Sequence, residues 1–116
     1  MGGSFETSPS HGSADQQPLQ VAVQKDSLMQ AAVELAEDMG WSITSNDEAS
    51  GTIVCSAEGG FLKGRSVITL TFEGPEGIPS TTVNVRSETQ GGLLGADKAN
   101  VTKFRKLFDR RTSASK

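Results

Sequence analysis

Few side chains in this sequence have the chemistry of a catalyst. The one histidine, His11, lies in a stretch rich in glycine, serine and glutamine, where no rigid neighbour would orient it as a general base. The one cysteine, Cys55, lies in the apolar segment 52–57, and burial there disfavours the thiolate that a nucleophile needs. One cysteine and one histidine cannot supply the clustered ligands of a zinc site. We therefore expect no catalytic residue, no metal site and no cofactor.

A glycine-rich stretch, Gly91-Gly92-Leu93-Leu94-Gly95, resembles a phosphate-binding loop, because backbone N–H groups before a helix attract anions. It matches neither G-x-G-x-x-G nor G-x-x-x-x-G-K-[ST], and Asp97 would place a negative charge where the anion should lie. We interpret the stretch as a flexible connection. Its Leu93-Leu94 pair either packs under the last helix or offers a mobile apolar contact.

Charge is divided unevenly along the chain, whose formal net charge is -3. Residues 97–116 hold seven basic side chains and two acidic ones, so the rest of the chain is acidic. The basic end is either a solvated helix face that complements the helix dipole or a contact with an anionic surface. Nucleic acid is not expected, because the pI of the whole chain is near 5.1. The candidate contacts with an anionic surface are Lys103, Lys106, Arg110 and Arg111.

The elements that must position these side chains lie between residues 18 and 110, which we expect to form a single domain. A chain of 116 residues has no room for a second core. Residues 1–17 contain one large apolar side chain, Phe5, and this composition predicts a disordered N-terminal tail. Residues 111–116 are predicted to be a disordered C-terminal tail.

Alternating apolar and polar residues predict five strands, at 19–23, 41–44, 52–57, 65–72 and 81–87. Amphipathic spacing predicts one helix from an Asp26 N-cap to Gly40 and another from about Asp97 to Asp109. Gly40 suits the left-handed residue that ends a helix, and Trp41 should pack back on the last turn. The predicted fold class is α+β, a β-α-β-β-β-β-α two-layer sandwich with both helices on one face of an antiparallel sheet.

From Gly40 onward, the sequence resembles a family of small bacterial domains of unknown function. The residues that carry the resemblance are a V-x-V-R-S strand, Val83-Asn84-Val85-Arg86-Ser87, then Gly91 or Gly92, and an N-x-x-[RK]-[IF] helix, Asn100-Val101-Thr102-Lys103-Phe104. The family's D-x-G-x-N pattern is not met, because Gly95 and Asn100 are five residues apart. No site is carried over from that pattern.

The order of elements, with the stretches 31–41 and 64–72, also resembles two other kinds of domain. One is the kinase-associated C-terminal module that binds acidic phospholipid, and the other is the helix-grip domain of an outer-membrane assembly lipoprotein. These resemblances imply a helix-grip or TATA-binding-protein-like arrangement and a role without catalysis. Topology alone does not decide function.

We expect a small non-enzymatic binding or scaffolding domain, which would hold its partner between helices and sheet or on the open sheet face. The alternative is a peripheral docking module that binds acidic phospholipid through the last helix, and an enzyme is a weaker third option. No stretch approaches the roughly 18 apolar residues of a membrane span, so we expect a soluble chain. We expect a monomer, although an edge strand such as 19–23 could pair with a neighbouring copy. A location in the bacterial cell envelope would follow if a signal had been removed from the N-terminus.

Overall fold

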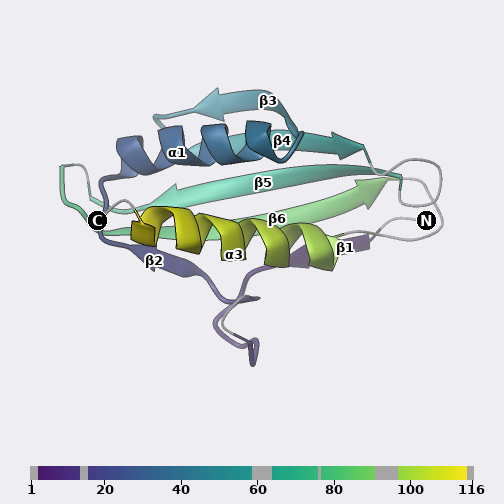
Figure 1. Ribbon diagram of the computed structural model, residues 1–116, viewed down its shortest axis with the longest axis horizontal. Coiled ribbons are helices and arrows are strands. Elements are labelled where there is room, and N and C mark those ends of the chain that lie inside the picture. The colour runs from purple at the N-terminus through teal and green to yellow at the C-terminus, as the bar shows by residue number, and fades with distance from the viewer. Residues whose placement is uncertain (1–2, 14–15, 59–63, 76, 91–96, 115–116) are drawn as a thin grey trace.

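Two helices cover one face of an antiparallel sheet in the computed structural model of the chain (Figure 1). The structure describes residues 3–13, 16–58, 64–75, 77–90 and 97–114. The fold class is α+β, as the sequence predicts, with six strands in the described part of the chain rather than five. The elements are β1 (Gly3–Glu6), β2 (Leu19–Val21), α1 (Lys25–Asp38), β3 (Ser42–Asp47), β4 (Thr52–Glu58), β5 (Arg65–Glu73), β6 (Thr81–Gln90) and α3 (Asp97–Ala114).

The strands lie in the order β1-β6-β5-β4-β3, and β2 pairs with β6 as well. The consecutive strands β3 to β6 form an antiparallel meander, in which β5 and β6 pair from Arg65 opposite Gln90 to Glu73 opposite Thr82. On the other side of β6, β2 pairs with residues 81–83 and β1 with residues 86–89. Two short strands therefore share one edge of β6.

The core lies between the sheet and the helices because strand side chains alternate between two faces. In β5, Ile68 and Leu70 are fully buried toward the helices, whereas Thr69 and Thr71 are half-buried on the opposite face. As the alternation predicts, side chains from different elements meet in one buried cluster, which includes Leu35, Ile68, Val83 and Phe104.

The end of α1 agrees with the prediction. Gly40 has φ of 84°, its N–H donates to the carbonyl of Glu37 at 3.0 Å, and the N–H of Trp41 donates to that of Ala36 at 2.9 Å. This pair of bonds satisfies carbonyls that the last helical turn leaves unpaired. It also turns Trp41 into the core, where its ring stacks on Phe104 of α3 with centroids 5.5 Å apart.

The predicted N-cap of α1 is wrong. Gln24 occupies the cap position without a side-chain cap hydrogen bond, and the helix begins at Lys25. Asp26 lies in the first turn, where its carboxylate Oδ1 accepts a hydrogen bond from the N–H of Ser27 at 2.9 Å. Its negative charge interacts favourably with the positive end of the helix dipole.

The predicted disorder of residues 1–17 is wrong for the described part of that segment. Gly3–Glu6 forms β1, and the next residue, Thr7, is 5% exposed. The N–H of Thr7 donates to the carbonyl of Val85 at 2.9 Å, and its Oγ1 accepts the N–H of Val85 at 3.0 Å. Composition misses this strand because backbone groups of β6 hold it rather than a run of apolar side chains.

The predicted tail at residues 111–116 is wrong as far as Ala114, where α3 ends. Thr112 is buried at 5% exposure, and its hydroxyl donates to the carbonyl of Phe108 at 2.9 Å. Arg111 forms an ion pair with Asp38 of α1 at 2.7 Å. These contacts hold the last turns of α3 on the domain.

Candidate functional site

The start of α3 is held on β6 by a buried carboxylate. Asp97 is 7% exposed, and its Oδ1 accepts hydrogen bonds from the hydroxyls of Ser87 at 2.7 Å and Thr89 at 2.6 Å. The side-chain amide of Asn100 donates to the hydroxyl of Ser87 at 3.3 Å. The hydroxyl oxygens of Ser66, in β5, and Thr89 lie 3.3 Å apart. From the sequence, Asp97 is expected to begin the last helix and to disfavour an anion there; in the structure its carboxylate also binds the hydroxyls of β6 that hold the start of α3.

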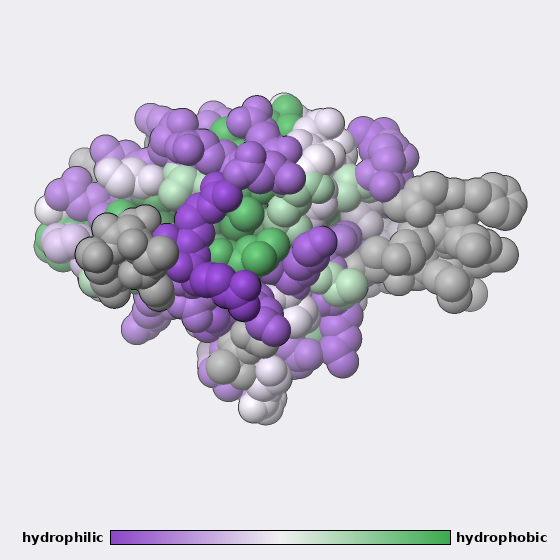
Figure 2. Space-filling view, viewed as in Figure 1, coloured by the Kyte–Doolittle hydropathy of each residue, from purple (hydrophilic) through white to green (hydrophobic). Residues whose placement is uncertain are grey.

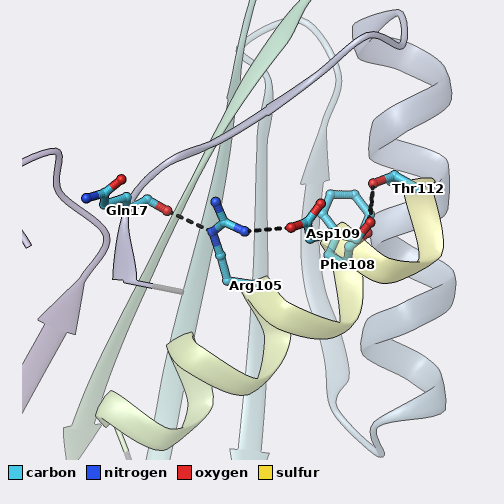
Figure 3. A network of polar contacts seen from close by, with 5 residues as sticks. All are labelled: Gln17, Arg105, Phe108, Asp109 and Thr112. Carbon is cyan, nitrogen blue, oxygen red and sulfur yellow. Dashed lines mark hydrogen bonds and ion pairs between the residues drawn. The ribbon is translucent and has the colours of Figure 1, made fainter. Parts of the chain in front are cut away.

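The middle of α3 is tied to the N-terminal segment by Arg105 (Figure 3). The side chain of Arg105 is 9% exposed; its Nε donates to the carbonyl of Gln17 at 3.0 Å and its Nη1 to Asp109 at 3.1 Å. A buried guanidinium is stable only when its N–H donors are paired with acceptors. The carbonyl of Gln17 and the carboxylate of Asp109 each accept one hydrogen bond from this group. Arg105 is therefore a structural cation that the sequence analysis did not separate from the others on this helix.

The outward face of α3 carries three cations. Each residue of an α-helix turns by about 100°, so positions 103, 106 and 110 fall within roughly 60° of one another, opposite the buried Val101 and Phe108. Lys103, Lys106 and Arg110 are all exposed. We call these three residues the basic stripe. The structure thus brings three of the four predicted contact residues together.

The fourth predicted contact, Arg111, lies on a different side of α3. It is half-buried and its Nη2 donates to Oδ2 of Asp38 at 2.7 Å, which links α3 to α1. Its partner is 73 positions away in the sequence, so no local pattern could reveal the contact. This ion pair shows which flank of each helix faces the other.

The outward face of α1 has the opposite charge. Glu34 and Glu37 are exposed and lie opposite the buried Leu28 and Ala32 on the helical wheel, whereas Asp38 lies on the flank that pairs with Arg111. We call Glu34 and Glu37 the acidic stripe. Because both helices bury their apolar faces against the same side of the sheet, the acidic and basic stripes point away from the sheet in the same direction.

Apolar atoms lie between the two stripes. Leu107, one turn before Arg111, and Ala31, two turns before Asp38, are partly buried and lie on the flanks that this ion pair joins. Figure 2, which views the helix-bearing face, shows hydrophobic surface near its centre with hydrophilic side chains on either side. The helix layer therefore presents an apolar centre between an anionic and a cationic border.

Cys55 is fully buried in β4, as the apolar pattern predicts. Burial raises the pKa of its thiol from 9.0 to about 11, because the charged thiolate loses its hydration inside the core. At neutral pH the group is a protonated thiol without access to solvent, which is the state of a structural cysteine.

His11 has rigid neighbours, contrary to the sequence prediction. Its ring stacks on Phe5 with centroids 4.9 Å apart, and its Nε2 lies 3.0 Å from the carbonyl oxygen of Glu6. A shallow cavity of about 310 Å³ adjoins it, and Arg86 on its border is paired with Glu88 at 3.0 Å. The cavity is lined by Ser4, Phe5, Glu6, Ser8, His11 and Arg86.

A second cavity, of about 300 Å³, lies at the start of α1 and has mixed charge. Lys25 and Asp26 come from the helix, and Glu48 from the turn between β3 and β4. Within the described ranges, no three His, Cys, Asp or Glu side chains are grouped closely enough to hold a metal ion. No helix there combines the length and apolar character that a membrane span requires.

No model of a known protein family matches the sequence, and no curated protein matches it significantly. The glycine-rich stretch at residues 91–95, with Leu93 and Leu94, lies outside the described residues.

Proposed function

We propose that this chain is a non-enzymatic binding domain that docks on a protein partner through its helix layer, with the basic stripe holding anionic groups of that partner. The observation that carries the proposal is the exposure of Lys103, Lys106 and Arg110 within one narrow sector of α3. Ala99 completes the sector, and none of the residues in it is acidic. Cations gathered in this way attract an anionic partner and fix its orientation.

The other arginines of α3 support this assignment because they have structural roles. Arg105 is buried against Gln17 and Asp109, and Arg111 is paired with Asp38. In the described part of the chain, no ion pair joins a cation of the basic stripe to a carboxylate. The positive charges of the basic stripe are therefore exposed to solvent and open to contact with a partner.

The absence of catalysis remains part of the proposal. It is supported by the burial of Cys55 and by the bond between His11 and a backbone carbonyl, which leaves that ring nitrogen engaged. A hydrolytic activity of the purified protein that Cys55→Ala or His11→Ala removed would contradict this part.

The alternative is docking to acidic phospholipid, which the basic stripe also favours. The acidic stripe argues against it. Both stripes point away from the same side of the sheet, so a flat anionic membrane against the helix layer would face Glu34 and Glu37 together with the lysines. A protein partner can match the two signs separately, which a uniform surface cannot.

A matched pair of variants tests the basic stripe. Lys103→Gln/Lys106→Gln removes two exposed positive charges from α3, and Arg65→Gln/Arg86→Gln removes two from the sheet. The probes are a polyglutamate peptide and vesicles of acidic phospholipid, each titrated at low and high salt. At about 1 kcal/mol per cation, the α3 variant should bind polyglutamate roughly 30-fold more weakly than wild type, and the sheet variant nearly as well.

Three results would contradict the proposal or part of it. Equal losses in both variants would show that net charge alone drives binding. Failure of the wild type to bind either probe at low salt would remove the basic stripe as an anion-binding surface. Tighter binding to vesicles than to polyglutamate would replace the protein partner by the lipid alternative.

A further inference from the structure

The helix layer carries the acidic stripe on α1 and the basic stripe on α3, and this pattern of charge is complementary to itself. α1 presents Glu34 and Glu37, and α3 presents Lys103 and Lys106, all exposed. The helices lie side by side on the same sheet face, α1 toward β3 and α3 toward β1 (Figure 1). A partner that satisfies both strips needs a cationic strip opposite α1 and an anionic strip opposite α3, at the same separation.

A second copy of the chain has that pattern. Rotation about a two-fold axis that runs along the helices, in the plane of the layer, exchanges the two strips. It places α1 of each copy opposite α3 of the other. The same contact then forms twice, as in the isologous interface of a symmetric dimer.

The centre of the layer is suited to the same contact. Leu107 and Ala31 are partly buried on the helix flanks that the ion pair between Arg111 and Asp38 joins. Figure 2 shows hydrophobic surface near the centre of the helix-bearing face, with hydrophilic borders. A specific interface has this arrangement, an apolar centre that excludes water and a charged rim that sets orientation. Exposed ion pairs alone stabilise little, so the apolar centre is needed for a stable contact.

We propose that the helix layer is the interface of a symmetric homodimer, in which the acidic stripe of each copy faces the basic stripe of the other. This inference rests on the proposed function, which it deepens by naming a second copy as the partner. It replaces the monomer expected from the sequence. A membrane or an acidic peptide matches one strip and repels the other, whereas a second copy matches both.

Charge reversal on each strip tests the interface. Glu34→Lys/Glu37→Lys makes α1 cationic, and Lys103→Glu/Lys106→Glu makes α3 anionic; all four side chains are exposed, so the fold should persist. Wild type should dimerise in sedimentation equilibrium between roughly micromolar and millimolar concentration, more tightly at low salt. Each reversed variant alone should dimerise at least tenfold more weakly, because like charges then face each other.

Two further samples restore complementarity. An equimolar mixture of the two reversed variants should form a heterodimer, and a chain with all four changes should form a homodimer again. Matched controls on the sheet, Glu58→Lys/Glu73→Lys and Arg65→Glu/Arg86→Glu, make the same changes in charge and should leave the wild-type constant within a few fold.

A wild type that stays monomeric over the whole concentration range would overturn the homodimer. Dimerisation unaffected by reversal of either strip, or not restored in the mixture, would overturn this interface. Both failures are distinguishable from failure of the proposed function. Polyglutamate binding that depends on Lys103 and Lys106 would survive them, and Glu34→Lys/Glu37→Lys would strengthen it.

Discussion

Replacing Asp97 by alanine should release the start of α3 from β6 and lower the free energy of unfolding by about 3 kcal/mol. Its carboxylate accepts two hydroxyl hydrogen bonds, at 2.7 and 2.6 Å, and the residue is 7% exposed. Hydrogen bonds to a charged group contribute about 1.5–3 kcal/mol each. We expect the lower end of that range, because Ser87 keeps its bond from Asn100 and Thr89 keeps its contact with Ser66.

The assay is urea unfolding followed by the fluorescence of Trp41, the one tryptophan, which stacks on Phe104 of α3 and so reports whether that helix is docked. With a urea m value of about 1.5 kcal/mol/M, the midpoint should fall by about 2 M. The matched control is Asp26→Ala, an exposed acid in the first turn of α1, whose loss should lower stability by about 1 kcal/mol at most.

A double-mutant cycle separates the hydrogen bonds from other effects. In a Ser87→Ala/Thr89→Val background the donors are gone, so Asp97→Ala should lower stability by much less than in wild type. A loss within about 0.5 kcal/mol of zero for Asp97→Ala alone would refute the reasoning, because a surface acid behaves in that way.

Three other changes should have measurable effects. Arg105→Met should speed amide hydrogen exchange in residues 3–17 by about tenfold or more, because it removes a bond of 3.0 Å to that segment; unchanged exchange would show that the bond is dispensable. Gly51→Ala should lower the urea midpoint more than Gly77→Ala: both glycines have positive φ, but only the Gly51 Cβ would clash with a backbone carbonyl of β5. Cys55 has a pKa raised from 9.0 to about 11, so its contribution to stability should be present below pH 9.0 and lost as pH rises toward 11; rapid alkylation of the native thiol at neutral pH would contradict its burial.

The meander and the packing of the helices follow from local patterns. Alternation in β5 places Ile68 and Leu70 on one face, and Gly40 followed by Trp41 predicts how α1 ends. These features depend on residues close together in the chain, so the amino-acid sequence alone is sufficient to infer them.

The N-terminal strand and the ends of α3 depend on distant partners instead. β1 is held by hydrogen bonds to the backbone of β6, and backbone donors and acceptors are the same whatever the side chains. The polar composition of this segment therefore predicts disorder where the structure has a strand. The alternation of Ser4, Phe5, Glu6 and Thr7 is the one local sign of a strand there.

The candidate site is predictable in part. The spacing of Lys103, Lys106 and Arg110 on α3 places them on one face, so all three can be inferred from the sequence as candidate contacts. The separate roles of Arg105 and Arg111 depend on Gln17 and Asp38, which lie 88 and 73 positions away. Arg105 also lies next to Phe104 and four residues before Asp109, and the helical wheel could have placed it on the buried side.

The claim that the helix layer, and not the open face of the sheet, is the interface between two copies of the chain is tested most directly by amide NMR spectra of the wild type over a dilution series. We predict that dilution shifts the amide signals of Glu34, Lys103, Lys106 and Arg110, and leaves those of Val67 and Thr69 on the open face unchanged. Shifts confined to the open face, or no shifts between roughly millimolar and micromolar concentration, would contradict it.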